Sequence, residues 1–298
     1  MQTAELRRLN FHHLHYFWVV AKDGNLTRAA GLLHVSQSAL SAQIRQLETQ
    51  LGHALFDRDG RVLRLTEVGR VVLGYAEGIF NLGRELLSAV RGGEGQTSQA
   101  LRIGAVATLS RNFLENLLRP VLGDDTLQLV LESASLEELL ERLRIHKLDL
   151  ILSNRPVAPD GQQSWRCKRI ARQRVCLVGP PLRRRKQFRF PQDLANVRLL
   201  LPGRSSDIRS QFELLCEDLG VTPRPYAEVD DMAMLRLLAR DSGGVALVPE
   251  VVVQDELQAG VLQKYCELPK VVENFYAITT ERQFQPQALK RLVAARNI

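Results

Sequence analysis

Residues 26–69 read LTRAAGLLHVSQSALSAQIRQLETQLGHALFDRDGRVLRLTEVG, and the fold of the N-terminal part can be predicted from them. It begins with a short helical pattern, Leu26–Leu33, whose small residues let another helix approach closely, and it continues through a turn at His34–Ser36. A second helix is expected over Gln37–Gln50, because apolar side chains recur there at helical spacing. The residues that should form its buried side are Leu40, Ile44, Leu47 and Leu51.

The opposite side of this second helix carries short polar residues and an arginine. Short side chains let a helix lie deep in the major groove of DNA, where glutamine and arginine reach base edges and serine and threonine bind phosphates or bases. A hairpin is expected over Leu55–Leu65, with Asp59-Gly60 at its tip and arginines that suit a minor groove. The candidate DNA-binding residues are Thr27, Arg28, Ser36, Gln37, Ser38, Ser41, Ala42, Arg45, Arg58, Arg61 and Arg64.

A further helix, over Leu9–Lys22 and ended by Gly24, precedes this motif. Together these elements predict a winged helix-turn-helix domain over residues 1–65. Three histidines of the first helix, His12, His13 and His15, have no cysteine or carboxylate at ligand spacing, so we expect no metal site.

Residues 66–91 form one long amphipathic pattern. Thr66 is suited to cap this helix, and Glu67 to its positive N-terminus. Apolar residues recur at alternating intervals of four and three, as in a coiled coil, so we expect a dimer seam here. The alternative is a helix that packs only on its own chain. The seam residues are Val68, Val72, Tyr75, Ile79, Leu82 and Leu86.

Composition sets the class of protein. Of 298 residues, 45% are apolar and 24% are charged, which is ordinary for a soluble globular protein of two or three domains. The net charge of +7 permits a polyanionic partner. No apolar run is long enough to span a membrane, and the N-terminus does not have the pattern of a signal peptide. We therefore expect a cytoplasmic protein with no membrane partner.

The C-terminal part begins after a small, polar stretch at residues 92–99, GGEGQTSQ, which indicates a flexible linker. From Leu101 onward, β-type runs alternate with helical runs, a pattern that predicts an α/β fold with a parallel sheet. We expect an effector-binding domain over residues 100–298, built as two lobes joined by two crossings. Lobe one would take residues 100–172 and 273–298, and lobe two residues 173–272.

In a two-lobed fold of this kind, a small ligand lies between the lobes, at strand ends and helix N-termini. Hydroxyl groups and helix N–H groups suit a carboxylate, whereas Asp230 and Asp231 suit a cation, and both choices stay open. Each hydroxyl also has a simpler role as a helix cap. The candidate ligand-binding residues are Thr108, Ser110, Ser135, Arg204, Ser205, Ser206 and Asp230.

Other functions leave part of the chain unexplained. The sequence has no GxSxG, HExxH, P-loop or dinucleotide motif, so we expect neither an enzyme nor a cofactor. A two-lobed solute-binding protein would not need residues 9–91, and a general DNA-packaging protein would not need the lobes. The stretch Arg166–Arg189 has ten basic residues and no acidic one, which predicts a solvated loop, with a second DNA contact or a phosphorylated ligand as the alternatives.

The quoted stretch resembles the signature region of LysR-type transcriptional regulators, and agreement extends from about Leu14 to Gly69. The resemblance implies a sequence-specific DNA-binding regulator whose activity is modulated by a small ligand or ion between two lobes like those of periplasmic binding proteins. It also implies a homodimer through the long helix, commonly a homotetramer, with RNA polymerase as a candidate partner. The operator sequence and the choice between activation and repression stay open.

The chain departs from that pattern in two places. Ser38 stands where the family usually has proline and Ala42 where it often has arginine, which changes the reading face and so the operator. The segment Pro120–Leu127 is also several residues shorter than usual. These features, with HHLHYFW at 12–18, LLLPGR at 199–204 and AEVDD at 227–231, are similar to the subgroup that regulates sodium/proton antiporters. That similarity makes sodium and lithium the first ligands to test, before small carboxylates.

Overall fold

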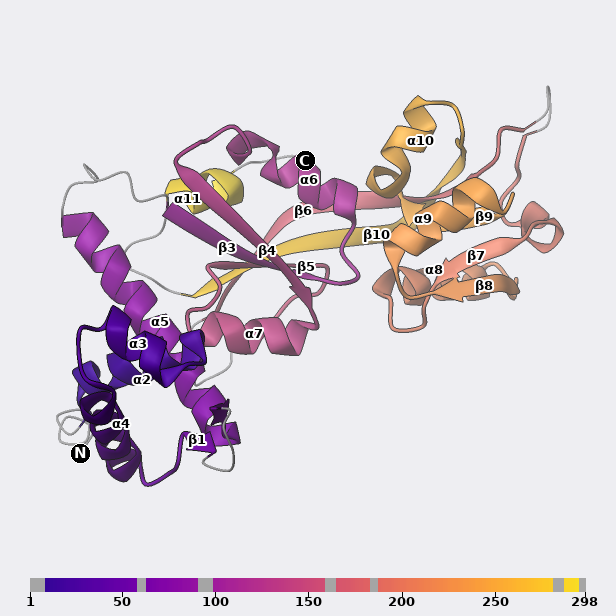
Figure 1. Ribbon diagram of the computed structural model, residues 1–298. Coiled ribbons are helices and arrows are strands. Elements are labelled where there is room, and N and C mark those ends of the chain that lie inside the picture. Colours follow the sequence, from indigo (N-terminus) through magenta and orange to yellow (C-terminus); the bar gives the residue numbers. More distant parts are fainter. Residues whose placement is uncertain are drawn as a thin grey trace. The chain divides into compact units, whose positions relative to one another are not determined.

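The computed structural model describes residues 9–57, 63–90, 99–158, 165–182, 187–280 and 287–294 (Figure 1). Its residues fall into two compact units. The first comprises Met1–Thr97 together with Glu141–Lys147, and the second comprises Ser98–Leu140 together with Leu148–Ile298. Within the described ranges, no helix combines the length and the apolar character that crossing a membrane requires.

The first unit contains the helices and the hairpin that the quoted stretch predicts. Gly24, with a φ of 72°, and Gly52, with a φ of 75°, end two helices in the left-handed conformation that favours glycine. The side chain of Asn25 caps another helix, accepting the backbone N–H groups of Thr27 and Arg28 at 3.0 Å each. The elements are α2 (Phe11–Asp23), α3 (Leu26–Leu32), α4 (Gln37–Leu51), β1 (Phe56–Asp57), β2 (Arg64–Leu65) and α5 (Glu67–Val90).

One apolar core holds α2, α3 and α4 together. Phe17, Leu40 and Leu47 are fully buried in it, and each such side chain stabilises the fold by roughly 1.5–3 kcal/mol. The rings of Phe17 and Phe56 lie 5.4 Å apart, so the same core fixes the first strand of the hairpin to α2.

Helix α5 begins where the sequence predicts and packs on the same core. Thr66 caps it as expected, because its Oγ1 accepts the backbone N–H of Gly69 at 2.9 Å. A Cβ on Gly69 would lie 2.1 Å from the backbone oxygen of Leu55, so a side chain here would push α5 away from the hairpin. Three of the expected seam residues, Val68, Val72 and Ile79, pack against this core of their own chain. Packing on its own chain, the alternative interpretation of the long helix, therefore holds for these three residues.

The second unit is built on one sheet of eight strands, in the order β4-β3-β5-β10-β6-β9-β7-β8. Its strands are β3 (Gln99–Val106), β4 (Leu127–Ala134), β5 (Leu150–Ser153), β6 (Trp165–Gly179), β7 (Leu199–Pro202), β8 (Pro225–Val229), β9 (Val245–Pro249) and β10 (Gln263–Thr280). Its helices are α6 (Arg111–Leu118), α7 (Leu136–Arg144), α8 (Asp207–Asp218), α9 (Met232–Asp241), α10 (Gln254–Gln258) and α11 (Gln287–Ala294), with short 3-10 turns at Arg119–Val121, Gln192–Asn196 and Glu250–Val253.

The strands β3, β4 and β5 of one lobe pair in parallel, as do β7, β8 and β9 of the other, whereas the long strands β6 and β10 pair antiparallel with their neighbours. β3 is parallel to β4 and β5, and β7 is parallel to β8 and β9. β10 is antiparallel to β5 and β6, and β6 is antiparallel to β9. The long strands β6 and β10 pair with each other through both lobes (Figure 1). The sheet is therefore mixed, and these two strands are the crossings that the sequence predicts.

The expectation of a solvated loop in the basic stretch is wrong for the residues of β6. Trp165 and Cys167 are half-buried, whereas Arg166 and Lys168, which alternate with them, are exposed. This alternation is the period of a strand with one covered face, and the long charged side chains hid it in the sequence. Residues 183–186, the densest part of the stretch, lie outside the described residues.

The lobes also touch through side chains of α6, α9 and α10. Arg236 on α9 donates to Asn112 Oδ1 on α6 at 2.9 Å and to Asp255 Oδ2 on α10 at 2.8 Å. Asn116 Nδ2 on α6 donates to Gln254 Oε1 at 3.0 Å. The bonds of Asn112 to Arg236 and of Asn116 to Gln254 cross between the lobes, in addition to the two strands, whereas Arg236 and Asp255 both belong to lobe two.

Candidate DNA-binding surface and effector site

Helix α4 presents a polar face to solvent. Ser36 Oγ accepts the backbone N–H of Ala39 at 3.2 Å, so the helix starts directly after Ser36. Burial of Leu40, Ile44 and Leu47 on one side fixes which residues face outward. The exposed residues of the outer face are Gln37, Ser38, Ala42 and Arg45, and Ser41 is half-buried. This is the set that the helical spacing predicts.

Neighbouring side chains orient several of the candidate DNA-binding residues. Thr27 Oγ1 on α3 donates to Gln37 Oε1 at 3.4 Å, which links the starts of the two helices. Arg28 Nε donates to both carboxylate oxygens of Asp23 at 2.8 Å, and this pairing raises the pKa of the Arg28 guanidinium. Arg45 Nη2 donates to Ser41 Oγ at 3.2 Å. Hydrogen bonds within the protein therefore already orient several of these side chains in the absence of DNA.

The hairpin is attached to α4 by a buried carboxylate. Glu48, on the inner side of α4, accepts the backbone N–H of Leu55 at 2.8 Å and that of Phe56 at 3.4 Å. Both of these residues are buried, so without Glu48 their N–H groups would lack this acceptor away from water. Arg64 on β2 is exposed. The candidates Arg58 and Arg61 lie outside the described residues.

Helix α5 has an apolar face that its own core does not cover. Leu86 is 63% exposed and Leu82 is 38% exposed, with Val71 and Val90 exposed on the same helix. Tyr75, another expected seam residue, is exposed but carries the guanidinium of Arg144 over its ring, at 5.2 Å from the centroid. The exposed apolar residues of α5 thus lie mainly in its second half.

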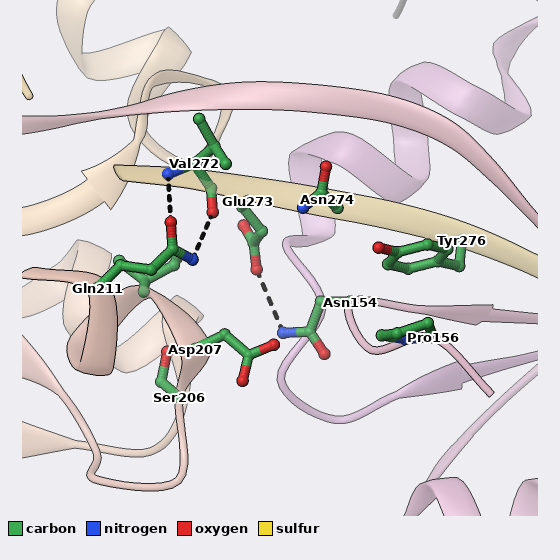
Figure 2. Close-up of a pocket in the computed structure, with 10 residues that line it drawn as sticks. Asn154, Pro156, Ser206, Asp207, Gln211, Val272, Glu273, Asn274 and Tyr276 are labelled. Carbon is green, nitrogen blue, oxygen red and sulfur yellow. Dashed lines mark hydrogen bonds between the residues drawn. The ribbon is translucent and has the colours of Figure 1, made fainter. Parts of the chain in front are cut away.

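A small cavity lies between the lobes of the second unit, beside β10 (Figure 2). Gln211 on α8 bonds twice to the backbone of Val272, accepting its N–H at 2.9 Å and donating to its carbonyl at 3.0 Å. These paired bonds hold the first turns of α8 against the crossing strand. The lining residues are Asn154, Pro156, Ser206, Asp207, Ile208, Gln211, Val272, Glu273, Asn274 and Tyr276.

Glu273 is the most unusual group in this cavity. Its side chain is 4% exposed. Oε1 accepts Asn154 Nδ2 at 3.2 Å, while Oε2 is buried without a hydrogen-bond partner among the described residues. Burial and the nearby charge of Asp207 raise the pKa of Glu273 to about 7, although the bond from Asn154 acts in the opposite direction. This carboxyl group therefore changes charge near neutral pH.

Of the residues that the sequence predicts for ligand binding, Ser206 lines the cavity. Thr108 does not line the cavity itself, but its Oγ1 donates to Oδ1 of the lining residue Asn154 at 3.3 Å. Ser110 and Ser135 cap α6 and α7, accepting N–H groups at 3.3 Å each. Elsewhere in the second unit, Arg204 pairs with Glu228 at 3.5 Å, Ser205 accepts a bond from Arg155 through its carbonyl oxygen, and Asp230 lies over Gly203.

Sequence reasoning missed Glu273, Asn154, Asp207 and Gln211. The available signal was a single acidic residue in the apolar run Val271–Phe275, where a carboxylate is expected only for a special reason. Nothing in the local pattern shows that residues 154, 207 and 273 meet, because they come from different lobes and from a crossing strand.

The cysteines and histidines of the described residues do not line this cavity. Burial raises the pKa of Cys176 to about 12 and that of Cys216 to about 11, so these thiols stay protonated and unreactive. His12 Nε2 lies 2.8 Å from Tyr16 Oη, and His13 Nε2 lies 3.2 Å from Asn10 Nδ2. Among the described residues, no group of three or more His, Cys, Asp and Glu side chains is placed to hold a metal ion.

The chain combines a winged helix-turn-helix, which has an exposed polar helix, with a long helix and a two-lobed domain that contains a cavity. This combination defines the class of transcription regulators that carry an effector-binding domain. Models of two known protein families match the two parts of the chain. The model of the bacterial regulatory helix-turn-helix protein of the lysR family matches residues 11–70, and that of the LysR substrate binding domain matches residues 94–295. The chain belongs to the LysR family: it is a DNA-binding transcriptional regulator and not an enzyme.

Relatives and solved structures agree with this assignment. The transcriptional activator protein NhaR of Escherichia coli K12 is 29% identical over 291 residues, covering 96% of this chain and 95% of that protein. The regulator PcaQ of Agrobacterium fabrum is 30% identical over 262 residues, covering 86% of this chain and 83% of that one. A full-length OxyR variant of Pseudomonas aeruginosa has the same fold, with a TM-score of 0.66 at 23% identity, covering 96% of this chain and 94% of that chain. CbnR in complex with its target DNA has a TM-score of 0.59 at 24% identity, covering 96% of this chain and 98% of that chain.

Proposed function

We propose that this chain acts as a homodimer, assembled into a homotetramer, that activates transcription when a small effector binds between the lobes of its second unit. Two features found together support the proposal. Helix α4 has an outward polar face, and the cavity between the lobes contains a buried carboxylate of which one oxygen has no hydrogen-bond partner among the described residues. Activation is the role that the name of NhaR states, and we extend it to this chain. RNA polymerase is the partner that activation requires, and the cytoplasm is where both partners meet.

The DNA-binding residues in this proposal are those that the sequence predicts. Gln37, Ser41 and Arg45 would read base edges, and Thr27, Arg28, Ser36 and Ser38 would bind phosphates. The wing arginines Arg58, Arg61 and Arg64 would bind beside the minor groove. We keep residues 1–65 as the DNA-binding domain, 66–91 as the dimerisation helix, 92–99 as the linker and 100–298 as the effector domain.

Gln37→Ala should weaken binding to the operator by about 1–3 kcal/mol, while binding to random DNA changes little. The reason is that Gln37 is exposed at the start of α4, where its amide can form two bonds to a base edge. Fluorescence anisotropy on operator and scrambled duplexes measures both affinities. Gln50→Ala makes the same chemical change on another exposed part of α4 and should leave both affinities unaltered. Equal losses on both duplexes for Gln37→Ala would exclude a base contact.

A ligand that binds between the lobes should stabilise the wild type more than Thr108→Val, because Thr108 orients Asn154 at the cavity. The measurement is thermal unfolding across a panel of sodium, lithium and small carboxylate salts. DNase footprints with each stabilising solute should change in length more than in affinity, since lobe closure changes the spacing of paired readers. Thr222→Val, at an exposed position, is the matched control. A solute that stabilises both proteins equally binds elsewhere.

A further inference from the structure

The first part of β6 is a basic strand segment with one open edge. Residues 165–174 of β6 pair with β10 on one side, whereas β9 pairs only with residues 175–178. In the described part of the chain, no strand therefore covers the other edge of residues 165–174. This segment contains no acidic residue. Its exposed basic residues are Arg166, Lys168, Arg169, Arg172 and Arg174.

A β-bulge puts three of these arginines on one face of the sheet. Residues that lie opposite each other in an antiparallel ladder share a face. The relevant pairs are Arg169 with Tyr276, Arg172 with Asn274, and Arg174 with Val272. These residues of β10 are each two positions apart, so they and their partners belong to one face. The register shift between Phe275 and Tyr276 leaves Ile170 as an extra residue in β6, and without it Arg169 would lie on the other face.

We call Arg169, Arg172 and Arg174 the arginine row, and most of its charge is available to a partner. Arg169 and Arg172 are exposed, and their side chains form no hydrogen bond or ion pair with the described residues. Arg174 pairs with Glu267, but its side chain is 75% exposed, so the guanidinium can still reach another anion. Within residues 272–276 of β10, the acidic residue is Glu273, which is buried and lies on the other face of the sheet. The row is therefore a local concentration of positive charge.

The spacing of the arginine row suits a regular polyanion. Successive residues on one face of a strand lie about 6.6 Å apart, at about 3.3 Å per residue, and like charges this close repel each other. A chain of phosphates removes that repulsion, because each guanidinium can bind a phosphate through two N–H groups. DNA carries one phosphate per about 3.4 Å of helix axis on each strand, so neighbouring arginines can reach different phosphates. Since the chain is a DNA-binding regulator, DNA is the polyanion that it meets.

We propose that the arginine row binds the phosphate backbone of DNA that flanks the operator, as a second DNA-contacting surface in addition to the one proposed on α4. The inference goes beyond the proposed function, because it requires neither the effector nor the tetramer. Contacts to phosphates carry no sequence information, so this surface adds affinity without changing which operator is read. It holds flanking DNA against the effector domain and thereby lengthens the region that the protein protects.

The test is the salt dependence of binding by the full-length protein to a duplex that carries the operator with long flanks. The double variant Arg169→Gln/Arg172→Gln removes the two charges that have no partner among the described residues. If each arginine binds one phosphate, the slope of log K against log[salt] should become less steep by about 1.8. Arg169→Lys/Arg172→Lys keeps both charges and should keep the slope. Arg111→Gln/Arg224→Gln removes two exposed charges elsewhere in the second unit and should bind like the wild type.

Several results would overturn this second surface. An unchanged slope in Arg169→Gln/Arg172→Gln does so, and if that variant also aggregates, the arginines protect the open edge of β6 instead. An equal change of slope in Arg111→Gln/Arg224→Gln would mean that net charge alone matters. Thermal stabilisation of the wild type by inorganic pyrophosphate, lost in the glutamine variant at an unchanged slope, would assign the row to a small phosphorylated ligand.

Two features of the experiment keep its result clear. Thermal unfolding should give the same Tm for all these variants, and if the double glutamine variant is unstable, Arg172→Gln alone should show half the change in slope. No effector is present in these measurements, so their failure would leave the proposed function unaffected.

Discussion

Glu48→Ala should loosen the wing and reduce operator affinity by about ten- to hundredfold. The Glu48 carboxylate accepts the N–H of Leu55 at 2.8 Å, and Leu55 is fully buried. Alanine removes this acceptor and leaves a buried N–H unpaired, at a cost of about 1–3 kcal/mol. These hydrogen bonds hold the wing against the end of α4, so their loss should disturb the position of the wing relative to α4. Amide hydrogen exchange of Leu55 and Phe56 and operator affinity are the two measurements.

Glu48→Gln is the matched variant, because its amide oxygen occupies the same place and still accepts the N–H. It should keep most of the exchange protection of Leu55 and most of the affinity. Gln50→Ala, which truncates an exposed side chain on the same turn, controls for loss of helix stability. Unchanged protection of Leu55 in Glu48→Ala would show that another group holds the wing, and the predicted loss of affinity would then have no basis.

Leu86→Asp should convert the proposed dimer into monomers and lower affinity for a two-half-site operator by about 10²- to 10⁴-fold. Leu86 is 63% exposed on the apolar face of α5 that its own core does not cover. A dimer seam would bury it, and an unpaired charge there is costly. Two linked readers bind a double site far more tightly than one, so loss of the dimer removes that gain. Sedimentation velocity and operator binding measure the two effects.

Position 79 would be a poorer choice for this experiment. Ile79 packs against the core of α2, α3 and α4, so a charge there would also disturb the DNA-binding fold. Arg84→Asp makes a larger charge change at an exposed position of α5 that carries no apolar side chain, and should leave the sedimentation of the protein unchanged. A monomer with Arg84→Asp, or a dimer with Leu86→Asp, would place the interface elsewhere. Affinity for a single half-site should be the same in all three proteins.

Local patterns were enough to predict most of the individual elements. Helical spacing predicted that Leu40, Ile44 and Leu47 face inward and Gln37 and Arg45 outward, and glycine predicted the helix end at Gly24. These features depend on neighbours three or four residues away, which a single sequence contains. The first, basic part of β6, residues 165–173, was missed, because solvated charges at every second or third position mask a period of two.

The winged helix-turn-helix, the long helix and the family could be predicted from the sequence, since each follows from residues close together in the chain. The tertiary structure was needed to show which apolar residues of α5 its own core covers: Ile79 and Leu86 belong to the same heptad pattern, yet one packs on that core and the other faces solvent. The tertiary structure also decided the cavity. Asn154, Asp207 and Glu273 are up to 119 residues apart in the chain, and Glu273 bonds to Asn154 across that separation. The physical reason is that burial shifts the charge balance of a carboxyl group only after distant segments have excluded water from it, and no local spacing records which segments will do so.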